Sequence, residues 1–332
     1  MNQTIRNSEQ LNAVIIDRVP RDRLSYVFFD EIQNVDGWEA SLAGLVAMGS
    51  CDVYVTGSNS DLLSSELATR ISGRHVEIKV FPLSLREFMT LHGYKDGDEA
   101  FTDYLSYGGL PAVDPERGER YAKDYLQAVY STVVINDVLR HVNASDPSKV
   151  ESIIRFLYSN IGNLTNTATI AKELGMNDPT VSHYIEAMKE AFLILPCQRY
   201  DMVGKKLLKT NGKYYVTDLG MRGAVLGLTA GRDISKPLEN LVYVELLRRG
   251  YDVRIGSYRD AEIDFIASRY DDIEYIQVCQ RLSSEETMAR ETRPLLRPKD
   301  NYTKTILTLD RYGLGDEKGI NVVNAVDWML EE

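Results

Sequence analysis

Short apolar runs alternate with helical patterns over the first 92 residues. Runs rich in β-forming residues lie at 26–29, 52–56 and 76–80, and each ends in polar or turn-forming residues. Helical patterns at 8–17, 38–48 and 61–72 fill the gaps between them. Strands that alternate with helices predict a parallel sheet covered by helices. The polar residues that follow the strands then lie at one edge of that sheet, where α/β proteins place their sites.

The pattern changes further along the chain. Residues 93–164 carry mainly helical patterns, whereas residues 219–332 return to strands that alternate with helices. Between them, Gly175 separates a short helix from a second helix that opens at Asn177, as in a helix-turn-helix. Asn211-Gly212 lies between two β-like runs, which predicts a hairpin and so a winged helix. The predicted fold is α/β, with a sheet covered by helices at 1–92, a helical region at 93–164, a winged helix-turn-helix at 165–218 and a second α/β domain at 219–332.

Composition narrows the class of protein. The 332 residues are 44% hydrophobic and 26% charged, which is typical of a soluble globular chain. No apolar run approaches the roughly 18 residues of a membrane span, and the start of the chain lacks an apolar signal core. We therefore expect a cytoplasmic protein with no membrane partner. The three cysteines lie far apart in the sequence, so they predict neither a disulfide framework nor a Cys-rich zinc site. The four histidines lack metal-ligand spacing.

Two acids follow the first predicted strand. Asp30 is suited to hold Mg²⁺ through its water shell, and Glu31 is suited to polarise an attacking water, as at the Walker B strand of a nucleotide hydrolase. The alternative is a strand that simply ends in solvated acids. The next strand ends in small polar residues, including Ser58 and Asn59, as a sensor strand does.

No phosphate-binding loop accompanies these acids in the sequence. A P-loop needs Gly-x-x-x-x-Gly-Lys-Ser/Thr, because its backbone N–H groups and its lysine cradle the phosphates. The only Gly-Lys pairs are Gly204-Lys205 and Gly212-Lys213, and neither has the required neighbours. Too few residues precede Asp30 to hold the loop together with its strand and helix.

The order of these motifs resembles the bacterial and archaeal AAA-type ATPases that carry a DUF4143 domain. The resemblance implies that Asp30 and Glu31 are the Walker B pair, with Mg²⁺ and ATP as ligands. It also implies that Ser58 or Asn59 is the sensor residue and that Arg74 or Arg70 is an arginine finger. Alternatively, the two arginines simply lie exposed at the end of a helix. The segments that carry the resemblance are 28–33, 56–60, 72–74, 81–88, 107–111, 239–242, 262–265 and 276–278.

The chain departs from that family at its start and resembles a truncated member, so the resemblance implies a partial P-loop ATPase sheet at 1–92. We expect ATP binding and hydrolysis to be impaired. The loss of a central strand would leave the strand at 52–56 with an unpaired side. We therefore expect either a loosely packed first domain or a homo-oligomer that covers the exposed edge.

The winged-helix region suggests a second function, which is binding of duplex DNA. Its second helix would present its side chains to the major groove, and the lysines of its hairpin would hold phosphates. The alternative is a winged helix that packs between domains or binds protein, since the net charge of the chain is −11. The residues expected at the DNA are Thr180, Ser182, His183, Lys205, Lys206, Lys209 and Lys213.

The last domain suggests a third function. Glu239, Asp264 and the run Gln277-Val278-Cys279 resemble the PD-(D/E)XK nuclease pattern, in which carboxylates hold a divalent metal and a lysine assists. Cys279 stands where that lysine is expected, and a thiol does not supply its charge at neutral pH. Glu239 and Asp264 are thus candidate metal ligands of a nuclease. The alternative is a nuclease-like fold kept for structure or binding.

Overall fold

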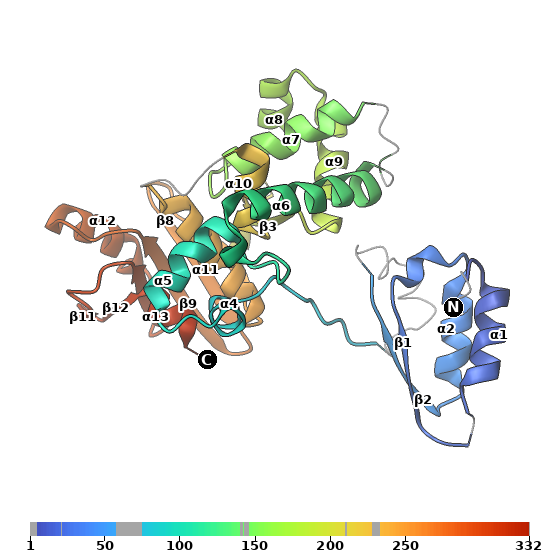
Figure 1. Cartoon of the computed structure of the whole chain (residues 1–332). Coiled ribbons are helices and arrows are strands. Elements are labelled where there is room, and N and C mark those ends of the chain that lie inside the picture. Colours follow the sequence, from blue (N-terminus) through green and yellow to red (C-terminus); the bar gives the residue numbers. More distant parts are fainter. Residues whose placement is uncertain are drawn as a thin grey trace. The chain divides into compact units, whose positions relative to one another are not determined.

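The chain forms two compact α/β units in a computed structural model, Met1–Lys79 and Val80–Glu332 (Figure 1). The structure describes residues 5–20, 22–57, 75–139, 142, 146–209, 211–227 and 233–331. The division precedes α4 (Leu85–His92), which packs against α5 and α13 of the second unit rather than staying with the first domain as expected. Within the described ranges, no helix is both long and apolar enough to cross a membrane.

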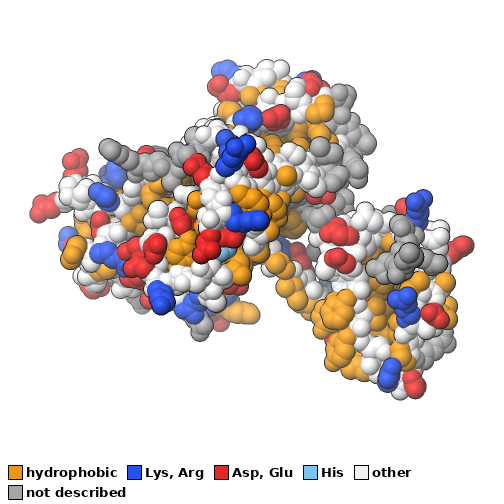
Figure 2. All heavy atoms as spheres, in the orientation of Figure 1, with side chains coloured by type: hydrophobic (Ala, Val, Ile, Leu, Met, Phe, Trp, Pro, Cys, Tyr) orange, Lys and Arg blue, Asp and Glu red, His pale blue; other side chains and the backbone are white. Residues whose placement is uncertain are grey.

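The first unit is a two-stranded parallel sheet with helices against one face. β1 (Ser25–Phe29) and β2 (Cys51–Val55) pair in register, with Phe29 opposite Val55. The inner face packs on a core from α1 (Ser8–Arg18) and α2 (Trp38–Ala47). On the outer face Tyr26, Phe28 and Tyr54 are exposed, and the rings of Phe28 and Tyr54 stack with centroids 4.8 Å apart. Hydrophobic side chains accordingly gather over this part of the first unit in Figure 2.

The third strand expected at 76–80 is not formed. Val76, Ile78 and Val80 alternate as a strand would, but each is at least 75% exposed. A strand needs a backbone partner, and the only strand pairing described in this unit is that between β1 and β2. The helix expected at 61–72 lies outside the described residues.

Helices dominate the first half of the second unit, as predicted. Gly175 ends α8 with a φ of +64°, and Asn177 caps α9 by accepting the N–H of Thr180 at 2.9 Å. The chain of α6 continues into a π-helical segment, Val134–Leu139. The helices are α5 (Gly97–Tyr107), α6 (Glu119–Val133), α7 (Pro147–Ser159), α8 (Thr167–Leu174), α9 (Asp178–Glu190) and α10 (Leu219–Leu226), with 3-10 turns at Ile32–Asn34 in the first unit and Pro115–Arg117 here.

The hairpin expected around Asn211-Gly212 is wrong. β6 (Lys213–Val216) pairs antiparallel with β3 (Ile194–Cys197), whereas β4 (Arg199–Asp201) and β5 (Lys206–Leu207) join a different sheet. β3 and β6 both contribute buried residues to the core, whereas β5 is exposed. Burial of apolar residues therefore selects β3 as the partner of β6 over the local Asn-Gly turn.

An eight-stranded mixed sheet forms the rest of the second unit. Its order is β11-β12-β10-β9-β8-β7-β4-β5, with antiparallel pairs β7–β8–β9 followed by parallel pairs β9–β10–β12 (Figure 1). Residues 238–246 of α11 are all buried, which places this helix in the core. The elements are α11 (Ser235–Arg248), β7 (Asp252–Ser257), β8 (Glu262–Arg269), β9 (Asp272–Cys279), α12 (Glu285–Leu295), β10 (Thr303–Thr308), β11 (Gly315–Glu317), β12 (Ile320–Asn324) and α13 (Ala325–Leu330).

The Tyr107-Gly108-Gly109 segment joins α5 to α10 through one buried carboxylate. Asp218 accepts the backbone N–H of Gly109 at 2.7 Å and caps α10 by accepting that of Met221 at 2.8 Å. A Cβ at position 108 would lie 2.3 Å from a carboxylate oxygen of Asp218, so the close approach requires glycine. This motif is therefore structural.

We predict that Asp218→Ala lowers the free energy of unfolding of the second unit by about 3 kcal/mol, because buried N–H groups lose their acceptor. Asp96→Ala, which removes an exposed N-cap, should cost about 1 kcal/mol. Urea unfolding followed by fluorescence of Trp328 in a Trp38→Phe background isolates this unit, because these are the two tryptophans of the chain. Equal losses in the two variants would contradict the prediction.

Candidate functional sites

The first candidate site lies at the carboxyl ends of β1 and β2. Asp30 and Glu31 follow β1, and Thr56 follows β2. The Thr56 hydroxyl donates to Asp30 Oδ1 at 2.6 Å and accepts the backbone N–H of Glu31 at 3.2 Å. The parallel register thus brings the exposed Thr56 to the exposed Asp30 and Glu31, which precede it by 26 and 25 positions. Sequence reasoning missed Thr56, although it is the polar residue that closes the second strand.

Glu31 adopts an unusual backbone conformation at this edge. Its φ is +51°, in the left-handed region that glutamate seldom adopts, and the 3-10 turn Ile32–Asn34 begins after it. The side-chain amide of Gln33 donates to Glu31 Oε2. The Gln33 amide and the left-handed backbone thus fix the direction of the Glu31 carboxylate at the end of β1.

The fit to Mg²⁺ and ATP is partial. A carboxylate and a hydroxyl are the hard oxygen ligands that Mg²⁺ prefers. The sequence as printed has no P-loop motif to hold the phosphates. The predicted sensor residues Ser58 and Asn59 and the predicted arginine fingers Arg70 and Arg74 lie outside the described residues, so their positions stay predictions.

The second candidate site is a buried cluster of charges in the second unit. The Lys213 ammonium lies 2.9 Å from Glu239 Oε1, 2.6 Å from Glu262 Oε1 and 3.7 Å from Asp264 Oδ1. Lys213 comes from β6, Glu239 from α11, and the other two acids from β8. Only 3% of the Lys213 side chain is exposed.

The expectation that Lys213 lies on an exposed wing is therefore wrong. Lys213 and Tyr215 alternate along β6 and point to the buried side, because β6 packs in the core and not at a surface. In contrast, Lys205, Lys206 and Lys209 are exposed in and after the turn between β4 and β5. On α9, His183 is exposed, while Thr180 and Ser182 are half-buried.

Further polar groups surround the two predicted metal ligands. Glu239 Oε1 also accepts the Tyr215 hydroxyl at 2.7 Å, and Glu239 Oε2 accepts the Lys236 ammonium at 2.8 Å. Asp264 Oδ2 accepts the backbone N–H of Val278 at 3.0 Å, and the Gln277 amide oxygen accepts the N–H of Asp264 at 3.2 Å. Glu239 and Asp264 thus share the Lys213 ammonium, and Gln277 contacts Asp264.

Burial and charge shift the pKa values of this cluster in opposite directions. Burial alone lowers the pKa of Lys213, but the carboxylates of Asp264, Glu239 and Glu262 outweigh it and raise that pKa. Burial opposes ionisation of Glu239, yet the ammonium groups of Lys213 and Lys236 keep its pKa below the usual value. Burial, together with the negative charge of Glu239, raises the pKa of Asp264 to about 7.

The arrangement does not fit a divalent metal. Within the described part of the chain, no three His, Cys, Asp or Glu side chains are grouped to hold a metal ion. The Lys213 ammonium occupies the space between the carboxylates of Glu239 and Asp264, and a metal there would meet its positive charge.

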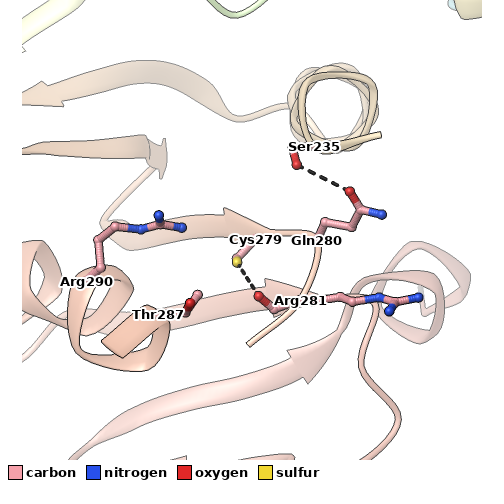
Figure 3. Close-up of a pocket in the computed structure, with 6 residues that line it drawn as sticks. All are labelled: Ser235, Cys279, Gln280, Arg281, Thr287 and Arg290. Carbon is pink, nitrogen blue, oxygen red and sulfur yellow. Dashed lines mark hydrogen bonds between the residues drawn. The ribbon is translucent and has the colours of Figure 1, made fainter. Parts of the chain in front are cut away.

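Cys279 lies apart from the cluster, in a pocket of about 680 Å³ at the end of β9 (Figure 3). Its thiol donates to the backbone carbonyl of Arg281 at 3.0 Å. Burial raises the pKa of this thiol, so it is a poor nucleophile at neutral pH. The guanidinium of Arg290, which also lines the pocket, pairs with Glu291 at 2.8 Å.

Comparison with known proteins places the chain in a family. A protein of Haemophilus influenzae described as "Uncharacterized protein" is 36% identical over 339 residues, covering 99% of this chain and 84% of its own length. The model of the AAA domain matches residues 2–89. The chain belongs to the same family as the Haemophilus protein, and its residues 2–89 match the AAA domain.

Other comparisons refine this assignment. The model of a domain of unknown function (DUF8612) matches residues 98–232 of this AAA-type protein, so the expected DUF4143 domain stays a prediction. An uncharacterized protein of Methanocaldococcus jannaschii is 27% identical over 305 residues, covering 86% of this chain and 67% of its own length. No solved structure matches the chain.

We predict that Glu239→Gln lowers the free energy of unfolding of the second unit by about 3 kcal/mol, because it leaves the buried Lys213 ammonium with less compensating charge. Glu151→Gln is a matched control: Glu151 pairs with Arg155 at the surface, where both side chains are 51% exposed, and its loss should cost under about 1 kcal/mol. Urea unfolding followed by Trp328 fluorescence measures both variants. A Glu239→Gln loss no larger than that of the control would show that the cluster contributes little.

Proposed function

We propose that this protein is an AAA-type ATPase. In this proposal Asp30, Glu31 and Thr56 form the site for Mg²⁺ and ATP at the carboxyl ends of β1 and β2. The observation that carries the proposal is the hydrogen bond from Thr56 to Asp30 across the ends of two parallel strands. The match of residues 2–89 to the AAA domain supports it, since both strands lie in that segment.

Each residue has a distinct role in this proposal. Bound Mg²⁺ would supply positive charge to the phosphates. Asp30 holds the ion, and the Thr56 hydroxyl fixes the orientation of the Asp30 carboxylate. Glu31, held by Gln33, positions the attacking water and takes its proton. Ser58 or Asn59 senses the phosphate, and Arg74 or Arg70 contacts the nucleotide of a neighbouring subunit in a homo-oligomer.

The residues of the printed sequence are expected to bind nucleotide weakly. In P-loop proteins, the backbone N–H cradle and the lysine make most phosphate contacts, and no such motif occurs here. We therefore propose that the 332 residues by themselves are impaired in ATP binding and hydrolysis.

We predict a weak, Mg²⁺-dependent contact with ATP, with a Kd of the order of 1 mM. Ligand-observed NMR detects binding in this range. Asp30→Ala should abolish the contact and Thr56→Val should weaken it several-fold, whereas Asp52→Ala, an exposed aspartate of the same sheet, should leave it unchanged. Tight binding would contradict the impairment, and binding that survives Asp30→Ala would contradict the site.

Duplex DNA binding is a second candidate function. It is favoured by the exposure of Lys205, Lys206 and Lys209 in one short segment that follows the two helices α8 and α9. The expected nuclease activity of Glu239 and Asp264 is not proposed here, because the Lys213 ammonium lies between their carboxylates.

The DNA proposal predicts a salt-dependent affinity. Replacing Lys205, Lys206 and Lys209 with glutamine should reduce the slope of the logarithm of the binding constant against the logarithm of salt concentration by about 2 to 3. Each lost phosphate contact removes about 0.9 from the magnitude of this slope. The triple variant of Lys95, Lys123 and Lys149, which are exposed on other elements, is the control. Fluorescence anisotropy of a labelled duplex gives both slopes. Absent binding, or equal slopes in the two variants, would rule the proposal out.

A further inference from the structure

The carboxylates of Glu239, Glu262 and Asp264 already share one cation, the ammonium of Lys213. Mg²⁺ needs oxygens at about 2.0–2.1 Å in an octahedral arrangement and keeps several waters. Here the Lys213 ammonium is 2.9 Å from Glu239 Oε1 and 3.7 Å from Asp264 Oδ1, so one cation already contacts both carboxylates. An ammonium and a divalent ion cannot share that position, because their charges repel.

The remaining oxygens of the two acids are also in use. Glu239 Oε2 accepts Lys236, and that lysine is held in turn by the carbonyl oxygen of Gly162 at 2.9 Å. Asp264 Oδ2 accepts the backbone N–H of Val278. A metal would therefore have to displace hydrogen bonds as well as Lys213.

The cluster also joins separate parts of the chain. Lys213 lies within the segment that matches DUF8612, whereas Glu239, Glu262 and Asp264 lie beyond it. Three elements, β6, α11 and β8, thus meet on one ammonium group.

We infer that Lys213 is an internal cation that replaces a divalent metal between Glu239 and Asp264, so that this core is held together without metal. The ammonium offsets part of the negative charge of the acids and fixes β6 to α11 and β8. Removal of Lys213 then creates a vacant site that accepts a divalent cation, and Mn²⁺ is a suitable probe.

The parent chain of this test is the full chain with Asp30→Ala and Trp38→Phe. Asp30→Ala removes the candidate Mn²⁺ site of the first unit, and Trp38→Phe leaves Trp328 as the single fluorescent tryptophan. The double variant Lys213→Met/Glu262→Gln removes one positive and one negative charge, which leaves the formal charge of the cluster unchanged. Electron paramagnetic resonance counts bound Mn²⁺, and fluorescence gives the Tm in EDTA and in Mn²⁺. The triple variant that adds Asp264→Asn is the control.

We expect the parent chain to bind no Mn²⁺ in the second unit and to show the same Tm in EDTA and in Mn²⁺. The double variant should have a lower Tm in EDTA, bind one Mn²⁺ and regain Tm with the ion, and the triple variant should lose that gain. If the double variant folds only when Mn²⁺ is present, its refolding yield is measured with and without Mn²⁺ in place of the Tm. We then expect a higher yield with Mn²⁺.

Two results would overturn the inference. The first is Mn²⁺ binding by the parent chain that Asp264→Asn removes, because Lys213 and the metal would then coexist. The second is a double variant that neither binds Mn²⁺ nor recovers Tm or refolding yield with it, because the acids would then not form a cation site at all.

Discussion

The second unit depends on the ion pair between Lys213 and Glu239. Burying an ammonium or a carboxylate alone costs several kcal/mol, and the cost is offset only where opposite charges and hydrogen bonds surround it. Here the charges come from β6, α11 and β8, with Tyr215 and Lys236 completing the environment of Glu239. These elements must be placed correctly before the pair forms, so the pair ties the β3–β6 ribbon to the large sheet.

Among its described residues, the first unit has no buried ion pair that ties its elements together in this way. Its two strands bury one face on α1 and α2 and expose Tyr26, Phe28 and Tyr54 on the other. The two strands that the structure describes here would be marginal as a sheet by themselves, and an exposed aromatic face favours association. The Asp30–Thr56 hydrogen bond depends on the register of this small sheet, so whatever covers the open face would also stabilise the candidate nucleotide site. The expected homo-oligomer is one such cover and stays a prediction.

Local signals in the sequence predicted much of this architecture. Asp30 and Glu31 follow a short apolar strand, and Asn177 begins a helix that Gly175 separates from the one before it; the structure places all four as expected. The strand at 76–80 and the Asn211-Gly212 hairpin were predicted from equally clear local patterns and are not formed. The segment 76–80 pairs with no other strand in the described part of the chain, and β6 pairs with β3 instead of with the neighbouring segment. Alternation and turn residues do not specify which strands pair.

The burial of Lys213 was hidden for a related reason. It follows a lysine-rich segment and an Asn-Gly turn, and both suggested an exposed loop. A Coulomb interaction depends on distance in space, so the cation of a buried site can come from any element that reaches it. The nuclease-like sequence pattern predicts a lysine at position 279 on β9, where the chain has Cys279. In the structure, Lys213 of β6 supplies the positive charge instead. A missing motif residue therefore does not show that its charge is missing, and here the charge lies directly on the acids, where it excludes a metal.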